Sequence, residues 1–381
     1  MPWKETEALD ERISFVVRSN GDKDYMTRLC EEYGISRPTG YLWLKRYGET
    51  GSVLGLLELS RRPYHIPRQT LPEIERRVLE IRAEYGRGAK KIKKRLDGEG
   101  VSLSVATINR IIKRHGLIKP EDSHKPALKR FERKAPNQLW QMDFKGEFKI
   151  RGGYCYPLTL LDDHSRYSLG IFALSDMQTK SVWPCLRRTF ERYGVPEAML
   201  MDHGTPCWST TNGHGLTSLG VKLIKQGIKL YLSGIRHPQT QGKLERFHRT
   251  LKHDILYRCH PQTLAQWKEA FEDFIEDYNR RRPHESLGME VPESRYNPSR
   301  VAYEPHPPEW EYPQGADVRR LNSQGMVEYS GRRYFVCEAL RRELIQLQTV
   351  DKLLLIKYRH MYIREIEVST GRTKAIIAPE S

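Results

Sequence analysis

Residues 1–118 carry apolar positions at helical spacing in two separate blocks. In the first block, three apolar side chains fall on one face of a predicted helix: Met26, Leu29 and Cys30. A glycine-bearing turn follows, and Ser36 is a suitable N-cap for a second helix. We expect that second helix to bury Tyr41 and Leu44. The pattern predicts a helix-turn-helix unit within residues 1–60.

A second helical block follows in residues 68–118. Its apolar stripes comprise Ile74, Val78 and Ile81 in one segment and Ile92 and Leu96 in the next. Ser104 is placed to cap a short third helix. The buried face of that helix carries Ile108, Ile111 and Ile112. We interpret this block as a second helix-turn-helix domain. The basic, polar stretch at residues 119–136 has no apolar periodicity and is predicted to be a linker.

From Leu139 onward the pattern changes to short strands. Three strands in succession are expected to form a meander, and each of two further strands comes after an amphipathic helix. The order of elements, βββαβαβα, predicts a mixed five-stranded sheet with helices on its faces. The first and fourth strands would be adjacent and parallel. We assign this α/β domain to residues 137–297.

The remaining chain changes character twice. Residues 298–316 are rich in proline, which predicts an extended tether. Residues 317–381 hold four or five short strands separated by turn signals, and we expect a small β-barrel there. The whole chain is therefore predicted to be a multidomain α+β protein.

The charge of the chain points to its partner. Its 381 residues include 64 Lys and Arg against 48 Asp and Glu, a formal net charge of +16. Such an excess favours a polyanion, most often nucleic acid, and a merely basic soluble protein is the alternative. The six cysteines form no CxxC pair, and no apolar run approaches membrane-spanning length. We therefore expect a cytoplasmic protein with reduced thiols that binds double-stranded DNA and no membrane.

The exposed faces of the two N-terminal units carry candidate DNA contacts. In the first unit they are Arg37, Thr39, Lys45 and Arg46. In the second they are Asn109, Arg110, Lys113 and Arg114. A basic helix after a glycine-bearing turn is typical of a recognition helix in the major groove. A small helical bundle with a solvated, charged face is the alternative. Two such units in tandem on a strongly basic chain favour DNA binding.

Three carboxylates stand at special places in the α/β domain. Asp143 lies in the first strand, Asp202 ends the fourth, and Glu245 falls in the first turns of the helix after the fifth. In an open α/β sheet, reactive groups gather beyond the strand ends where the strand order reverses. Because the first and fourth strands are expected to be neighbours, the two aspartates can converge. The helix can then bring Glu245 over them.

Such a group of acids suggests bound metal ions. Like charges at short range repel and raise one another's pKa unless a cation compensates them. Two Mg²⁺ ions about 4 Å apart provide that compensation and suit phosphoryl transfer on DNA. Hard divalent ions prefer oxygen ligands, and Mn²⁺ can substitute for Mg²⁺. Asp143, Asp202 and Glu245 are therefore predicted to be both metal ligands and catalytic residues.

The helix that carries Glu245 also carries cations. Its buried stripe comprises Leu244, Phe247 and Leu251. The candidate DNA contacts in and before the helix are His237, Lys243, Arg246, Arg249 and Lys252. Taken alone, Glu245 and Arg249 fit an ordinary surface ion pair worth a few tenths of a kcal/mol. For His237, ordering the preceding loop is an equal alternative to binding DNA.

Several motifs together resemble the DDE transposases of bacterial insertion sequences, which share the catalytic core of retroviral integrases. They are LWQMDFKG, LTLLDDHSRY, MDHGTP, HPQTQGKLERFHRTLK and YNRRRPHESLG, all within residues 137–297. The resemblance implies an RNase H-like core in which Asp143, Asp202 and Glu245 match the family's three metal ligands. Two features depart from the family. The stretch from Asp202 to Glu245 is longer than usual, and His203 replaces the Asn that often follows the second aspartate.

By this resemblance the chain would be a transposase that binds the terminal inverted repeats of its element through the N-terminal units. It would cleave strands and join the 3′-hydroxyl to target DNA, as at least a dimer on DNA, in the nucleoid-containing cytoplasm of a bacterium. Two alternatives stay open: a non-catalytic helix-turn-helix regulator derived from a transposase, and a nuclease that only hydrolyses DNA. The three intact carboxylates argue against the regulator, and the basic helix and linker favour joining over cutting alone.

Overall fold

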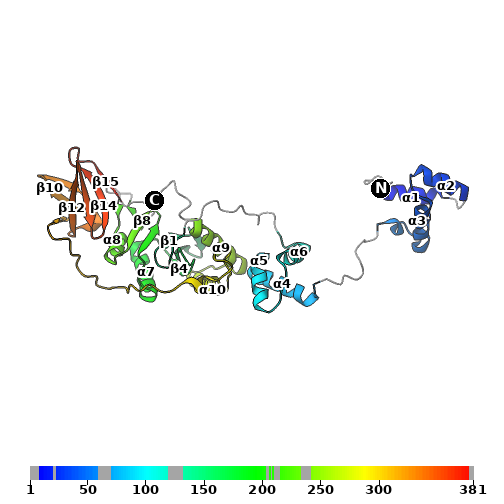
Figure 1. Cartoon of the computed structure of the whole chain (residues 1–381), viewed down its shortest axis with the longest axis horizontal. Helices are drawn as coiled ribbons and strands as arrows, with labels where there is room; N and C mark the ends of the chain where they lie inside the picture. Colours follow the sequence, from blue (N-terminus) through cyan, green and yellow to red (C-terminus); the bar gives the residue numbers. More distant parts are fainter. Residues whose placement is uncertain are drawn as a thin grey trace. The chain divides into compact units, whose positions relative to one another are not determined.

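The computed structural model describes residues 8–19, 23–58, 70–118, 132–202, 206, 208–209, 215–232 and 242–376. The chain divides into two compact units, Met1–Thr70 and Leu71–Ser381 (Figure 1). None of the described helices combines the length and the apolar character that a membrane span requires.

The first unit contains three helices, α1 (Ala8–Arg18), α2 (Lys23–Glu32) and α3 (Arg37–Thr50), and a 3-10 turn, η1 (Val53–Leu56). Its core includes Met26, Leu29 and Cys30, as the helical spacing predicts. The hydroxyl of Ser36 caps α3 by accepting a hydrogen bond from the amide of Thr39, which confirms the predicted N-cap. The core also takes Phe15 from α1, a helix that the sequence pattern did not reveal.

The prediction that α3 buries Tyr41 is wrong, because Tyr41 is exposed. Leu44, the other residue predicted to be buried, is only partly buried. Gly40 and Trp43 face the core instead. The physical reason is a close approach at Gly40, where an added Cβ would lie 2.8 Å from the Cys30 sulfur. Trp43 lies one turn further along the same face and is buried with it.

The helical block of the second unit contains α4 (Pro72–Tyr85), α5 (Ala89–Gly98) and α6 (Val105–Arg114). Its core holds most of the predicted apolar stripe: Val78, Ile81, Ile92, Leu96, Ile108, Ile111 and Ile112. Ile74 is only half-buried. Ser104 caps α6 through the amide of Thr107, as predicted.

A buried ion pair connects this helical block to the α/β domain. Arg87, between α4 and α5, donates from Nη2 to the two carboxylate oxygens of Asp277 at 2.7 and 2.5 Å. Asp277 belongs to α10 (Leu264–Arg280), and both side chains are buried. Arg87 also donates to the carbonyl of Arg281 at 3.1 Å. Because a buried charge requires its partner, these contacts fix the helical block on the end of α10.

Replacing Arg87 with alanine is expected to lower the free energy of unfolding by about 3–5 kcal/mol, because Asp277 is left charged and buried. Arg258, whose Nη2 lies 3.7 Å from Asp277, shifts the expected loss toward the lower value. Arg76→Ala is the matched control, since the Arg76–Glu80 pair is exposed and worth at most about 1 kcal/mol. Urea unfolding compares the two variants, and equal losses would contradict this account.

The central sheet has six strands among the described residues. They are β1 (Trp140–Phe144), β2 (Phe148–Ile150), β3 (Gly153–Asp162), β4 (Ser168–Leu174), β5 (Ala198–Met201) and β8 (Lys229–Leu232). The order is β2-β3-β1-β5-β8, and β4 also pairs with β3. The prediction of five strands is one short, because the first predicted strand is interrupted at Gly146. That residue has a φ of 94°, which ends β1. The chain then continues in the same direction as β2, which also pairs antiparallel with β3.

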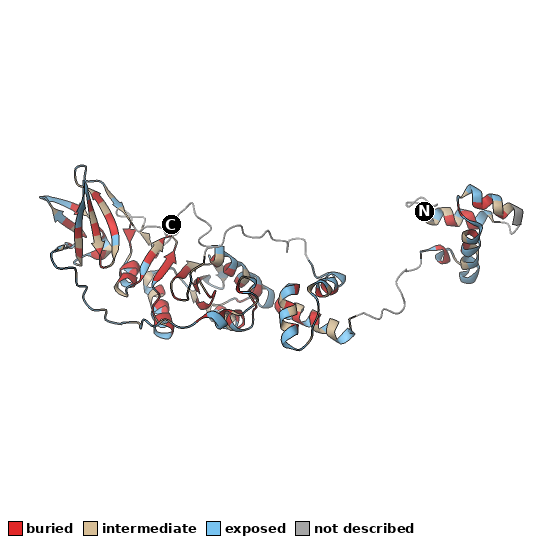
Figure 2. Cartoon of the chain, in the orientation of Figure 1, coloured by how far each residue is buried: buried red, intermediate tan, exposed pale blue. Residues whose placement is uncertain are grey.

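Helices cover both faces of the sheet (Figure 1). On one face, α7 (Thr179–Tyr193) and α8 (Ser218–Lys225) share an apolar cluster with β1, β3, β5 and β8. On the other face, α9 (Gly242–Arg258) and α10 pack against β3 and β4. β5 is buried along its whole length, and β3 is buried over most of its length, whereas β2 has no buried residue (Figure 2). β1 pairs with β5 in parallel, as predicted for the first and fourth strands.

The C-terminal residues form an open antiparallel sheet. Its strands are β9 (Asp317–Arg320), β12 (Leu344–Val350), β13 (Leu353–Tyr358), β14 (Met361–Glu367) and β15 (Thr373–Ala375), in the order β15-β14-β13-β12-β9. β10 (Met326–Tyr329) and β11 (Arg332–Phe335) form a separate hairpin. Within the described residues no pairing joins the edge strands β15 and β9, so the expected closed barrel is not found.

This C-terminal sheet packs directly on the α/β domain, and its apolar side chains belong to the same cluster as those of α7 and α8. The Cys337 thiol donates to the carbonyl of Leu216 at 3.4 Å, and Lys225 pairs with Glu343 at 2.6 Å. In the Pro-rich stretch, Tyr303 packs against the cluster. The expectation of an extended, unpacked tether is therefore wrong at Tyr303, because an aromatic side chain between the prolines finds an apolar surface.

Candidate active site

The two aspartates lie on neighbouring parallel strands. Asp143 is in β1, and Asp202 is the first residue after β5. The β1–β5 register pairs Trp140 with Met199 and Gln141 with Leu200. Continued by two residues, this register sets Asp143 opposite Asp202. The strand order therefore brings the two carboxylates to one edge of the sheet, as the sequence predicts.

The third carboxylate is on α9. Glu245 lies in the first turn of this helix, and its side chain is exposed. Asp143 is three-quarters buried, with a side-chain exposure of 24%. Burial, then the negative charge of Asp202 and to a smaller extent that of Glu245, raise the pKa of Asp143 to about 7. Asp143 thus lies within electrostatic reach of both other acids.

The backbone around Asp143 is tightly bonded. One of its carboxylate oxygens, Oδ1, accepts a hydrogen bond from the amide of Phe144 at 2.8 Å. Its carbonyl oxygen accepts from the hydroxyl of Thr159 at 2.8 Å. Thr159 lies opposite Asp143 in the β1–β3 register and is fully buried. The position of the Asp143 backbone is therefore fixed by its own strand pairing and by a side chain of β3.

The raised pKa of Asp143 predicts a pH-dependent stability for the metal-free protein. The folded carboxyl keeps its proton up to about pH 7, whereas the model-compound pKa for the unfolded chain is 3.8. Between these values the folded state binds more protons, so the free energy of unfolding falls as pH rises, by up to about 4 kcal/mol. Asp143→Asn should remove this fall. Urea unfolding in a chelator at pH 5 and pH 8 compares the two proteins. An identical pH dependence in the variant would refute the prediction.

The donor set fits a hard divalent cation. Asp143, Asp202 and Glu245 offer only carboxylate oxygens, which suit Mg²⁺ or Mn²⁺. Burial and the charges of Asp202 and Glu245 raise the pKa of Asp143, and a bound cation would favour the ionised carboxylates. Within the described part of the chain, however, no three His, Cys, Asp or Glu side chains form a ready-made metal cage. The fit thus rests on the chemistry of the donors and on their shared edge of the sheet.

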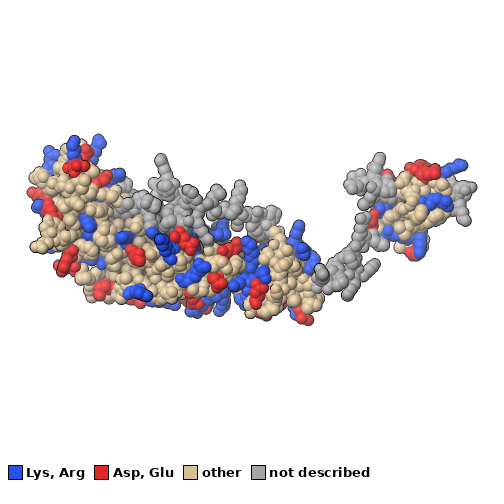
Figure 3. All heavy atoms as spheres, in the orientation of Figure 1, with Lys and Arg blue, Asp and Glu red and all other residues tan. Residues whose placement is uncertain are grey.

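α9 separates its apolar and charged sides as predicted. Leu244, Phe247 and Leu251 are buried. Arg246, Arg249 and Lys252 are exposed beside Glu245. In Figure 3, lysine and arginine side chains spread over the visible faces and are interspersed with acids. The exposed cations of α9 are therefore available to phosphate on the same helix that carries the third carboxylate.

Lys243 is placed differently from its neighbours. Its ammonium group lies 2.5 Å from the Asp163 carboxylate, and the side chain is only 14% exposed. Burial lowers the pKa of Lys243 to about 8, although the charge of Asp163 opposes this shift. The cation that the sequence predicts as a DNA contact is thus engaged with the sheet, 80 residues away in the chain.

The adjacent acids Asp162 and Asp163 bind protein groups. Asp162 accepts from the amides of Asn137 and Ser165 and from the Ser165 hydroxyl, at 2.6–2.8 Å. Asp163 accepts from the amide of Arg133 and from Gln141, as well as from Lys243. Both side chains are fully buried. They hold the turn between β3 and β4.

The residues of the first unit that were predicted to contact DNA are not equally exposed. Arg37 and Lys45 are exposed, whereas Thr39 and Arg46 are half-buried. Arg46 donates to the carbonyl of Leu57 at 2.6 Å and lies over the ring of Trp43. The guanidinium of Arg46 therefore contributes to the fold of its own unit.

The residues of the second helical block that were predicted to contact DNA all lie on the outer side of α6. Asn109, Arg110, Lys113 and Arg114 are exposed. Arg114 also pairs with Glu75 of α4 at 2.5 Å. The remaining candidates, His237 and the His203 that departs from the family pattern, lie outside the described residues.

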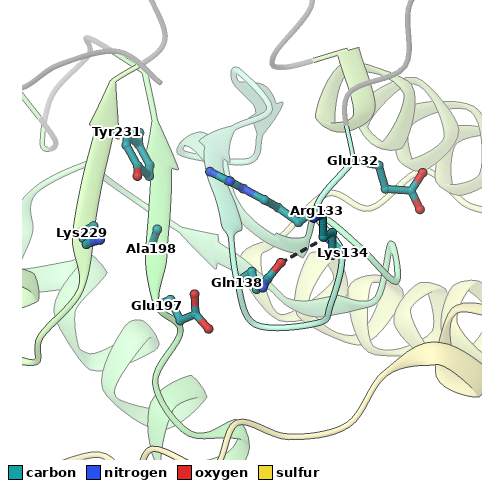
Figure 4. A pocket seen from close by; sticks show the side chains of 8 residues that line it. All are labelled: Glu132, Arg133, Lys134, Gln138, Glu197, Ala198, Lys229 and Tyr231. Atoms are coloured by element: carbon teal, nitrogen blue, oxygen red, sulfur yellow. Dashed lines mark hydrogen bonds between the residues drawn. The ribbon is translucent and has the colours of Figure 1, made fainter. Parts of the chain in front are cut away.

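The protein also has a surface pocket of about 380 Å³ that no sequence motif predicts (Figure 4). It is lined by Glu132, Arg133, Lys134, Gln138, Glu197, Ala198, Lys229 and Tyr231. Glu197 and Lys229 stand at the beginnings of β5 and β8. Because Asp202 follows the other end of β5, the pocket is separate from the carboxylates. Its residues come from segments far apart in the chain, so no local motif could have revealed it.

Domain models and relatives agree with the motifs. Residues 133–238 and 226–292 match models of the integrase core domain, and residues 39–112 match a homeodomain-like domain. A transposase for insertion sequence element IS904 of Lactococcus lactis is 26% identical over 257 residues, which cover 60% of this chain and 98% of that protein. An uncharacterized protein of insertion element IS407 from Burkholderia multivorans is 27% identical over 158 residues. That match covers 42% of this chain and about half, 54%, of the relative.

Solved structures give weaker matches. The HTLV-2 integrase catalytic core domain in complex with magnesium has 14% identity and a TM-score of 0.34, covering 42% of this chain and 97% of that one. A simian T-cell lymphotropic virus intasome chain has 10% identity and a TM-score of 0.39, covering 80% of this chain and 100% of that one.

Proposed function

Because residues 133–292 carry an integrase core domain and the relatives include an insertion-sequence transposase, we propose that this chain is a DNA transposase. It binds the terminal inverted repeats of its element, cleaves strands at the element ends, and transfers the 3′-hydroxyl into target DNA. The reaction is phosphoryl transfer with two divalent metal ions, and Asp143, Asp202 and Glu245 are the proposed ligands.

One observation carries this proposal: the parallel register of β1 and β5 sets Asp143 opposite Asp202 at one edge of the sheet. The negative charges of Asp202 and, to a smaller extent, Glu245 both act on Asp143. Like charges close to a partly buried carboxylate disfavour its ionised form. A regulator that only binds DNA has no use for such repulsion within its fold. The acids are therefore better explained by a cation that they hold during the reaction.

Each proposed ligand comes from a different element. Asp143 comes from β1, Asp202 from the end of β5 and Glu245 from α9, so the site depends on the tertiary fold. When bound, divalent ions activate the attacking oxygen and stabilise charge on the phosphate and leaving group. The exposed Arg246, Arg249 and Lys252 of α9 bind backbone phosphate, and the carboxylates orient the reacting group.

In this proposal the two N-terminal helical units recognise the ends of the element. The exposed Arg37 and Lys45, with Thr39 and Arg46, contact DNA from the first unit in this proposal. Asn109, Arg110, Lys113 and Arg114 contact DNA from α6, and His237 belongs to the same DNA-binding set as α9. Since two ends must meet before joining, the active species is at least a dimer on double-stranded DNA.

A joining assay tests the proposal. Labelled duplexes with the ends of the element that encodes the chain are incubated with plasmid target and Mg²⁺ or Mn²⁺. The expected products are labelled ends joined to plasmid, and the expected loss on chelation is complete. Cleavage without joining would point to a hydrolytic nuclease. Specific binding of the ends without either reaction would point to a regulator.

A further inference from the structure

α9 is anchored on both sides of Glu245, to strand β3 and to the turn that follows it. Two residues before it, Lys243 reaches Asp163 and its carbonyl oxygen at 2.5 and 3.2 Å. Three residues after it, Nε2 of His248 lies 2.8 Å from the hydroxyl of Thr159. His248 and Thr159 are both buried. The segment that carries the third carboxylate is therefore fastened to the sheet at two points.

The hydrogen bond of His248 has a defined direction. The Thr159 hydroxyl has a single proton, and it donates that proton to the carbonyl oxygen of Asp143. It can therefore only accept from His248, so Nε2 of the imidazole carries the proton. Nδ1 is then unprotonated and faces the Asp143 carboxylate, with 3.8 Å between Nδ1 and Oδ2. The bonds form one continuous path from α9 through Thr159 to the backbone of Asp143.

This path connects two of the proposed ligands. One end is the α9 backbone one turn after Glu245, and the other is the peptide group of Asp143. The side chains of His248 and Thr159 are both buried, so water cannot readily replace a hydrogen-bond partner that a mutation removes. Outer groups that orient metal ligands in this way commonly change metal affinity or activity by about 10–100-fold.

We propose that His248 and Thr159 are positioning residues that set the separation between Glu245 and Asp143 and thereby the affinity of the site for divalent metal. This inference rests on the proposed function, because it assigns a metal to these carboxylates. Neither residue is proposed to touch DNA or metal. Their effect passes through the two ligands that they hold.

Variants that break or keep the path test the inference. Thr159→Val and His248→Leu each remove a hydrogen bond, whereas Thr159→Ser keeps the hydroxyl. Thr189→Val is the matched control, since Thr189 is also buried and donates to a carbonyl, that of Cys185 in α7, at 2.9 Å. The Mn²⁺ dissociation constant of the DNA-free full chain is measured by electron paramagnetic resonance. Two further quantities are measured for each variant: the Mg²⁺ concentration that gives half-maximal joining, and the free energy of unfolding in urea.

The path-breaking variants are expected to raise the Mn²⁺ dissociation constant and the half-saturating Mg²⁺ concentration about tenfold or more. Thr159→Ser should stay within about twofold of the wild type, since the hydrogen bonds are kept. Combining Thr159→Val with His248→Leu should add little, because the two residues form one path. Thr189→Val should lower stability without changing metal affinity.

Unchanged Mn²⁺ affinity in stably folded Thr159→Val or His248→Leu protein would overturn the inference and leave these residues a packing role only. Equal affinity losses in Thr189→Val would overturn it as well. A wild type that binds Mn²⁺ but joins no DNA would refute the transposase activity, while the Mn²⁺ measurements would still decide on positioning. A wild type that binds no Mn²⁺ would overturn both proposals.

Discussion

Asp143→Asn, Asp202→Asn and Glu245→Gln are each expected to reduce DNA joining by at least about a thousandfold, or about 4 kcal/mol in the activation barrier. Each change removes one negative oxygen donor from a group that must hold divalent cations. Binding of element ends should persist within about threefold, since the helical units supply most phosphate contacts in the proposal. The joining assay and gel-shift titrations in Ca²⁺ measure the two effects separately.

The control for these changes is an exposed carboxylate on a different helix. Glu269 is exposed on α10, whereas Glu245 belongs to α9. Glu269→Gln removes the same charge as Glu245→Gln and should leave joining unchanged. Joined products at the wild-type level from any one of the three site variants would show that its carboxylate is not a required ligand.

A chain that ends at residue 316 is expected to lose its cooperative fold and all joining activity. The C-terminal sheet and helices α7 and α8 share one apolar cluster, so the deletion would expose a surface that is buried in the full chain. Each large apolar side chain newly exposed to water costs about 1.5–3 kcal/mol. Stabilities of folded domains are only about 5–15 kcal/mol, so a few such residues suffice. Near-ultraviolet circular dichroism and urea titration would follow the loss.

Two point variants test whether loss of apolar packing, and not shortening of the chain as such, causes the loss of stability. Leu340 is completely buried in this cluster, and Leu340→Ala should cost about 2–5 kcal/mol. Val350 is 47% exposed at the end of β12, and Val350→Ala should cost less than about 0.5 kcal/mol. Retention of a sharp unfolding transition by the shortened chain would mean that the C-terminal sheet folds independently and only rests on the core.

The features that sequence predicts well are local or periodic. The caps at Ser36 and Ser104 follow from one side chain and the amide three residues later. The parallel pairing of β1 and β5 follows from the order of strands and crossovers, and it brings Asp143 and Asp202 to one edge. The order of strands and crossovers therefore predicted that Asp143 and Asp202 would lie at one edge, while their role as ligands stays a prediction.

Features that depend on distant contacts could not be predicted in the same way. Lys243 belongs to a basic segment by sequence, yet its partner Asp163 is 80 residues away. The same is true of Arg87 and Asp277, 190 residues apart. For Lys243 the basic segment suggested a DNA contact, and for Arg87 no local pattern indicated a role. Burial against a specific acid decided the place of both.

The C-terminal region shows a related difficulty. Short strands with turn signals predict a β domain, but they do not say whether its edges close. Proline-rich composition suggested an extended tether, whereas Tyr303 packs against the apolar cluster. Strand closure and packing between distant segments depend on the shapes of both surfaces, which hydrophobic periodicity does not describe.

The most direct test of the central claim is metal-directed cleavage of the protein backbone. Fe²⁺ can replace Mg²⁺ at carboxylate sites, and with ascorbate and peroxide it produces radicals that cut the chain close to the metal. The account predicts fragments ending near Asp143, Asp202 and Glu245, suppressed by excess Mg²⁺ and lost in Asp143→Asn. Cleavage at only one of these positions, or an unchanged pattern in Asp143→Asn, would contradict a metal site shared by the three carboxylates.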